Sequence, residues 1–204
     1  MMESFFGRVS GVWPAGRRDL HWHILPTPDE TAELIAPYKG ISGPGLSRVP
    51  ADWMHCTLLH AVGLGRDAVD IDALLDDVQT SAQNLEPVIL TFDRPYVGAV
   101  AVEVSGWPGS PFRTLVDTVS EATARTGAAH SAAPSRYPHM SLGYTTADAD
   151  ALDAVALRAA LSEIEQPLSA TVVANRIHLV EQWHDGEYIR WTPIAEVPLL
   201  GART

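Results

Sequence analysis

Two short apolar segments, far apart in the chain, share one unusual pattern. The first reads "WMHCTLLH" over residues 53–60, and the second reads "PHMSLGY" over residues 138–144. Each contains a histidine, one further residue, a hydroxyl side chain and a leucine, and the two histidines, His55 and His139, are 84 residues apart (139 − 55). Short apolar runs bounded by turn residues are typical of strands. The pattern therefore predicts one such strand in each of two similar halves.

The sequence around these strands predicts a unit that occurs twice: a strand with a polar pair, a helix, and then a hairpin. Periodicity and turn residues divide the chain into alternating elements, with residues 41–50 as loop. The predicted strands are 19–26, 54–62, 88–92, 97–104, 139–144, 169–183 (one long strand or a bulged pair) and 187–199, and the predicted helices are 29–40, 67–85, 110–127 and 148–164. This order predicts an α/β fold whose two lobes face each other.

The spacing within each motif determines which side chains share a strand face. Side chains alternate along a strand with a period of two, so His55 and Thr57 are expected on one face, and His139 and Ser141 likewise. His60 and Tyr144 each follow their motif histidine by five residues. Alternation predicts that His60 points away from the motif face, and Tyr144 too unless a bulge intervenes.

Two imidazoles and two hydroxyls that meet at one point suit phosphate ester chemistry. A neutral histidine can take a proton from an attacking water, and a protonated one can give a proton to the departing oxygen. Histidine exists in both forms near neutral pH, and hydroxyls can donate hydrogen bonds to phosphate oxygens. This scheme predicts His55 and His139 as the catalytic pair and Thr57 and Ser141 as phosphate-binding residues, with no metal and no cofactor.

Three further residues are candidates for substrate contacts. Arg136, just before the second motif, could neutralise a phosphate, and Tyr144 could stack on a base. His23 could line the site from the segment "HWH" at residues 21–23. His21 and His23 could instead ligate a metal, together with His55 and His139, but neither motif contains an Asp or Glu to complete such a site.

Charge and composition narrow the choice of substrate and location. The formal net charge is −11, from 25 acidic against 14 basic residues, and Lys39 is the single lysine. Proteins that bind long nucleic acids neutralise several phosphates with Lys and Arg, so extended nucleic-acid binding is not expected. Cys56 alone can form neither an internal disulfide nor a cysteine zinc cluster. We expect a cytoplasmic protein, because no signal peptide and no apolar stretch of about 20 residues is seen.

The sequence resembles the two-histidine phosphoesterase superfamily. The resemblance lies in "HCTL", "HMSL", the strand "LHWHILP" and the proline before the second motif. That group includes bacterial 2′-5′ RNA ligase-like proteins and cyclic nucleotide phosphodiesterases. The resemblance implies a bilobal, pseudo-symmetric α/β (α+β) fold with two antiparallel-rich sheets flanking a central groove and helices outside. It implies a single domain over residues 1–204, with the two lobes interleaved by chain crossover.

The resemblance also implies an activity in RNA processing: hydrolysis of 2′,3′-cyclic phosphates, or cleavage and joining of 2′-5′ linkages. Carried over, His55 and His139 are the acid/base pair. The resemblance does not decide which histidine is the acid and which is the base. We start from His55 as the acid and His139 as the base. The acidic charge favours a small cyclic phosphate nucleotide or a short RNA end, without a membrane partner. The alternatives are a 2′-5′ RNA ligase, a non-catalytic nucleotide-binding module and a histidine-rich metalloprotein.

Overall fold

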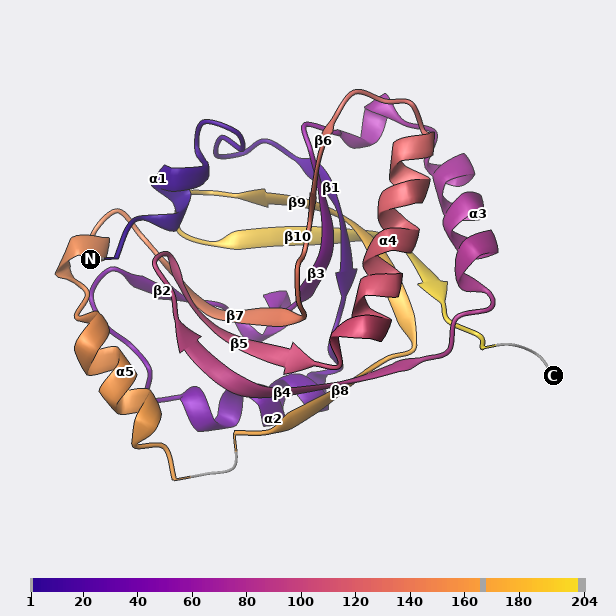
Figure 1. Ribbon diagram of the computed structural model, residues 1–204. Helices are drawn as coiled ribbons and strands as arrows, with labels where there is room; N and C mark the ends of the chain where they lie inside the picture. The colour runs from indigo at the N-terminus through magenta and orange to yellow at the C-terminus, as the bar shows by residue number, and fades with distance from the viewer. Residues whose placement is uncertain (1, 166–167, 202–204) are drawn as a thin grey trace.

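The computed structural model describes residues 2–165 and 168–201 and contains two five-stranded sheets (Figure 1). All neighbouring strands pair antiparallel. The first sheet has the order β10 (Ile189–Pro198), β9 (Arg176–His184), β1 (Asp19–Ile24), β3 (Cys56–Val62), β6 (Ser131–Pro134). The second has the order β2 (Leu46–Arg48), β7 (His139–Thr145), β5 (Ala101–Trp107), β4 (Val88–Val97), β8 (Ala170–Ala174).

The predicted fold class is confirmed: two antiparallel sheets with helices outside them. The chain passes from one sheet to the other several times. Along the chain, β2 of the second sheet comes between β1 and β3 of the first, and β8 of the second sheet comes between β6 and β9 of the first. One buried apolar cluster includes residues of both sheets, such as Trp22 and Phe92. These features support our proposal that residues 1–204 form a single bilobal domain.

Five α-helices accompany the sheets within the described residues: α1 (Phe5–Val9), α2 (Pro28–Ile35), α3 (Ile71–Ala82), α4 (Gly109–Arg125) and α5 (Ala154–Ser162). Short 3₁₀ turns cover Ala36–Tyr38, Ala51–Trp53, Arg66–Ala68 and Ala149–Ala151. Helices α3 and α4 lie together beside the first sheet, while α2 and α5 border the second (Figure 1). None of the described helices is long and apolar enough to cross a membrane.

Local sequence explains where the helices begin and what they cover. Thr27 and Glu30 form a reciprocal capping box at the start of α2, which satisfies backbone donors that the first helical turn leaves free. Helix α4 buries side chains at helical spacing, including Phe112 and Val119. Trp22 of β1 donates a hydrogen bond of 3.2 Å to Thr123 of α4. This contact places α4 on one face of the first sheet, and the opposite face carries the first motif.

The structure corrects several predicted boundaries. The segment 169–183 is two strands of different sheets, β8 and β9, which separate at Asn175. Strand β2 lies within the predicted loop 41–50, and α1 and β6 were not predicted. Helix α4 begins at Gly109, one residue before its predicted start, and α5 begins at Ala154 after a 3₁₀ turn. The short elements have too few residues to show a period, and tertiary contacts form them.

Candidate active site

The two motif histidines enter the site in the same way from different sheets. The His55 Nδ1–H donates to the carbonyl oxygen of Trp53 at 2.7 Å, and the His139 Nδ1–H donates to that of Tyr137 at 3.1 Å. A carbonyl can only accept a hydrogen bond, so each neutral ring carries its proton on Nδ1. Nε2 is then the acceptor of each neutral ring. In both cases the carbonyl belongs to the residue two positions earlier.

The two motifs come together although they belong to different sheets. Strands β3 and β7 contact each other, and the backbone of His139 lies near enough to the Cys56 thiol to lower the pKa of that thiol, against the larger effect of burial. The charge of His139 also acts on the His55 ring, since it contributes to lowering the pKa of His55. The two motif strands are therefore close to each other, and that their side chains act together at one phosphate stays a prediction.

His55 and His139 differ in their surroundings. His55 is buried, and burial lowers its pKa to about 4, against the opposing effect of the Trp53 carbonyl. His139 is only partly buried, and its ring lies 5.1 Å from that of Tyr137. His55 is therefore neutral at pH 7, which suits a group that accepts a proton.

Both motif strands contain a bulge at the same motif position. On β3, Thr57 is paired with His23 but Leu59 with Trp22, so Leu58 is the extra residue. On β7, Ser141 is paired with Glu103 but Gly143 with Val102, so Leu142 is the extra residue. A bulge shifts the alternation by one residue. The next polar residue of each strand therefore returns to the motif face.

The bulges correct the predicted orientation of His60 and Tyr144. His60 is paired with His21 and stacks on it, with ring centroids 3.9 Å apart. Burial raises the pKa of Tyr144 to about 12, and the nearby Ser141 hydroxyl acts in the opposite direction. Both side chains lie on the motif faces of their sheets, which we call the site faces, and not on the opposite faces that simple alternation predicts.

The site face of the first sheet holds a column of imidazole rings. His23 stacks on His55 with ring centroids 4.3 Å apart and an angle of 15° between the planes. His21 follows at 5.5 Å from His23, and His60 stacks on His21. His21 and His23 are buried, and none of their ring nitrogens has a hydrogen-bond partner among the described residues. Burial lowers the pKa of both rings well below the ordinary value.

The remaining candidates have different positions. His23 is fully buried against His55, so we no longer propose it as a substrate contact. Arg136 is exposed, and its carbonyl accepts a hydrogen bond of 3.2 Å from Arg113; its role at a phosphate stays a prediction. Tyr144 packs on Phe5 at 4.6 Å and is almost completely buried.

Two contributors to the site have no signal in the sequence. The Trp53 carbonyl also accepts a hydrogen bond of 3.4 Å from the indole of Trp191. Glu103 lies opposite Ser141 and accepts a bond of 2.7 Å from the Tyr137 hydroxyl, which raises the pKa of Tyr137 to about 12. Both depend on strand pairing and chain folding, and no motif marks them.

Metal ligation by the histidines has no support in their arrangement. Among residues 2–165 and 168–201, no three His, Cys, Asp or Glu side chains are grouped so that they could hold one ion. The rings of His21 and His23 stack on neighbouring rings instead of converging.

Comparison with known proteins assigns the chain to a family. The model of the 2′-5′ RNA ligase superfamily matches residues 27–186. By structure, the chain is similar to Escherichia coli LigT complexed with 3′-AMP, with 20% identity, a TM-score of 0.63 and coverage of 89% of this chain and 98% of LigT. It is also similar to TT0787 of Thermus thermophilus, with 14% identity, a TM-score of 0.64 and coverage of 91% and 100%. No protein with a curated description matches by sequence. The chain belongs to the 2′-5′ RNA ligase superfamily of two-histidine phosphoesterases.

Proposed function

We propose that this protein is a phosphodiesterase that needs no metal ion and hydrolyses 2′,3′-cyclic phosphate or 2′-5′-linked nucleotides. The observation that supports this most is the matched pair of histidines. Each comes from its own sheet, each is held by the carbonyl two residues earlier, and each is followed by a hydroxyl on the same face. An acid/base pair with adjacent hydrogen-bond donors is sufficient for this chemistry.

We assign the base role to His55 and the acid role to His139. Burial keeps His55 neutral, so its Nε2 can accept a proton from the attacking water. The water oxygen forms a new bond to phosphorus while the bond to one ribose oxygen breaks. His139, protonated on Nε2, gives its proton to that departing oxygen. This is the reverse of the starting assignment, and the asymmetry in burial is the reason for the change.

Thr57 and Ser141 are proposed to donate hydrogen bonds to the non-bridging phosphate oxygens. Both are partly exposed, and each lies two residues after its histidine, on the same face. The Tyr144 hydroxyl is near enough to Ser141 for each to affect the other, and we propose that it orients the Ser141 hydroxyl. Such donors stabilise the charge that develops on phosphate oxygens during attack.

The proposed substrate is a small nucleotide or a short RNA end, handled in the cytoplasm during RNA processing. The net charge of −11 opposes binding of a long polyanion, and Glu103 adds a carboxylate beside Ser141. Solved structures of LigT include complexes with 3′-AMP, NADP+ and ATP, which are small nucleotides. Joining of RNA ends, the alternative, differs only in that a ribose hydroxyl replaces the attacking water.

The first test is a substrate panel of 2′,3′-cyclic mononucleotides and 2′-5′-linked nucleotides, assayed with and without EDTA. We expect hydrolysis of at least one class, with turnover unchanged by EDTA because both proton transfers use side chains. Joining of supplied RNA ends would favour the ligase instead. Complete loss of hydrolysis in EDTA would contradict the metal-free scheme, and binding without any turnover would favour a nucleotide-binding module.

A further inference from the structure

Residues 2–18 form a segment, here called the strap, that precedes the residues matched by the family model and lies against the site faces of both sheets. It contains α1 and the loop that carries Trp13. Figure 1 shows α1 close to the ends of β9 and β10.

On the second sheet the strap is fixed to the end of the strand that carries His139. The backbone N–H of Phe5 donates to the Thr145 hydroxyl at 3.0 Å, and the N–H of Glu3 donates to the Ala99 carbonyl at 2.8 Å. The rings of Phe5 and Phe6 lie 4.6 and 6.1 Å from Tyr144. Tyr144 is therefore covered by the strap on the site face.

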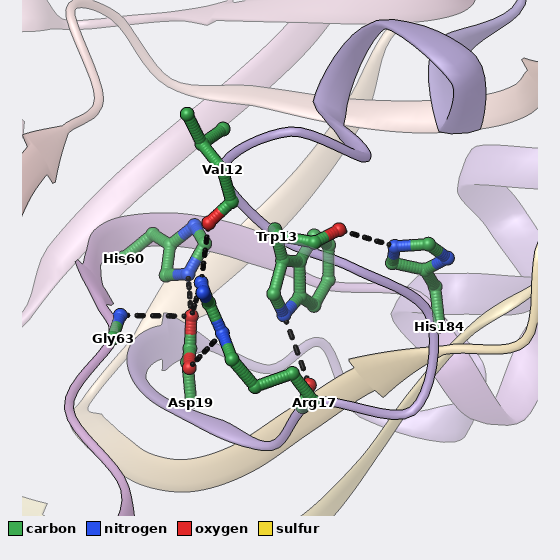
Figure 2. A network of polar contacts seen from close by, with 7 residues as sticks. All are labelled: Val12, Trp13, Arg17, Asp19, His60, Gly63 and His184. Carbon is green, nitrogen blue, oxygen red and sulfur yellow. Dashed lines mark hydrogen bonds and ion pairs between the residues drawn. The ribbon is translucent and has the colours of Figure 1, made fainter.

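On the first sheet the strap covers the far end of the imidazole column. Figure 2 shows Trp13 between His60 and His184, at ring distances of 5.1 and 4.7 Å. The Nε2–H of His184 donates to the Trp13 carbonyl at 2.8 Å. Trp13 also lies 5.6 Å from His21. Phe6 and Trp13 are both buried, with 5% and 3% of their surface exposed, so the strap fills this end.

A partly buried ion-pair network around the buried Asp19 carboxylate holds the base of the strap. The Arg17 guanidinium donates two hydrogen bonds to Asp19, of 3.0 and 2.8 Å, and one to the Val12 carbonyl (Figure 2). Asp19 also accepts bonds from His60 at 2.8 Å and from the N–H of Gly63 at 3.1 Å. Burial raises the pKa of Asp19, but these bonds outweigh it and leave the pKa below the ordinary value.

The position of the strap along the motif strands has a consequence for the substrate. Because of the bulges, the interval from Thr57 to His60 spans two residues of β1, and that from Ser141 to Tyr144 spans two residues of β5, which corresponds to about 7 Å of strand. The motif histidines lie on the side of Thr57 and Ser141 that faces away from the strap, so a nucleotide chain that leaves the phosphate on the histidine side runs away from the strap. In the other direction it meets Phe6 and Trp13, which lie against Tyr144 and His60, before there is room for a complete nucleoside.

We infer that the strap closes one end of the site and restricts the substrate to a phosphate at the end of a nucleotide chain. A 2′,3′-cyclic phosphate is such an end, whereas a 2′-5′ linkage inside a longer chain needs room on both sides. This inference rests on the proposed function. The proposed function leaves open whether the substrate is a 2′,3′-cyclic phosphate or a 2′-5′ linkage, and the inference selects the cyclic phosphate.

The test compares kcat/KM for 2′,3′-cyclic AMP with that for a 2′-5′-linked adenosine trinucleotide. We expect wild type to prefer the cyclic phosphate by at least about tenfold. F6A removes the ring that lies 6.1 Å from Tyr144 and 5.1 Å from His184, and we expect it to raise the trinucleotide-to-cyclic ratio about tenfold. V12A is the matched control, because Val12 lies in the strap but is 63% exposed; its ratio should equal that of wild type. F5A provides the same opening if F6A does not fold.

The result of this comparison separates the strap assignment from the proposed function. A wild-type enzyme that cleaves the trinucleotide as well as the cyclic phosphate overturns the strap assignment alone. An unchanged ratio in the folded strap variants does the same. Turnover of neither substrate by wild type overturns the proposed function, and the strap assignment with it.

Discussion

Replacing His55 with alanine will reduce hydrolysis of 2′,3′-cyclic AMP by about 10²–10⁴-fold, and His139→Ala will do the same, since each removes one proton transfer. The two rings act on one phosphate, so the double variant should be scarcely less active than either single one. Initial rates at saturating and limiting substrate give the measurement. Circular dichroism of each variant will establish that the fold is retained.

His130→Ala is the matched control for these variants. His130 precedes β6, and its Nδ1–H donates to the carbonyl of Ala128, two residues earlier, at 2.9 Å. It therefore has the same local geometry as the motif histidines but belongs to neither motif strand, and its loss should leave turnover unchanged. Near-wild-type turnover by His55→Ala or His139→Ala would refute the acid/base assignment.

The free energy of unfolding will fall by about 4 kcal/mol between pH 7.5 and pH 5.5, since each buried neutral histidine contributes about 1.4 kcal/mol over this range. The main contributors are the three buried histidines His21, His23 and His55, whose pKa values are lowered by burial; His178, which is only partly buried and whose pKa burial also lowers, adds a smaller part. A lowered pKa in the folded state means that only the unfolded chain takes up protons below about pH 6.5. Stability is thus complete above that pH and is lost as the pH falls toward the folded pKa, about 4 for His55.

Urea unfolding of wild type and His23→Leu at the two pH values measures this effect. The variant should lose about 1.4 kcal/mol less on acidification. It should also be more stable at pH 7.5, because it removes two buried nitrogens that lack hydrogen-bond partners among the described residues. Val78→Ala, a buried change in α3 without a titratable group, should lower stability equally at both pH values. A full pH difference in His23→Leu would show that His23 is not buried in its neutral form.

The motif pairs were predictable because the residues that form them lie two apart in a strand. The spacing of His55 and Thr57, and its repetition at His139 and Ser141, needs only strand alternation, and β3 and β7 begin close to where the sequence predicts them. Apolar periodicity, acidic residues in a first helical turn and cap residues also located the four longer helices, because each has enough residues to carry such signals.

The bulges at Leu58 and Leu142 were not predictable from alternation, which assumes a regular strand. One signal was available: His60 and Tyr144 occupy the same position after their motif histidines, and a repeated polar residue at an odd spacing indicates a shift of register. The strap was missed for a different reason. Its helix has five residues, and it is held by contacts with residues more than 100 positions away, such as Thr145 and His184.

The most direct test of the central claim is a titration of ¹⁵N-labelled protein with 3′-AMP, followed through the imidazole nitrogens by NMR. If both motif histidines touch one phosphate, the Nε2 signals of His55 and His139 will shift together and fit a single dissociation constant, while those of His130 will not move. A response from only one of the two motif histidines, or two separate dissociation constants, would contradict a shared phosphate site.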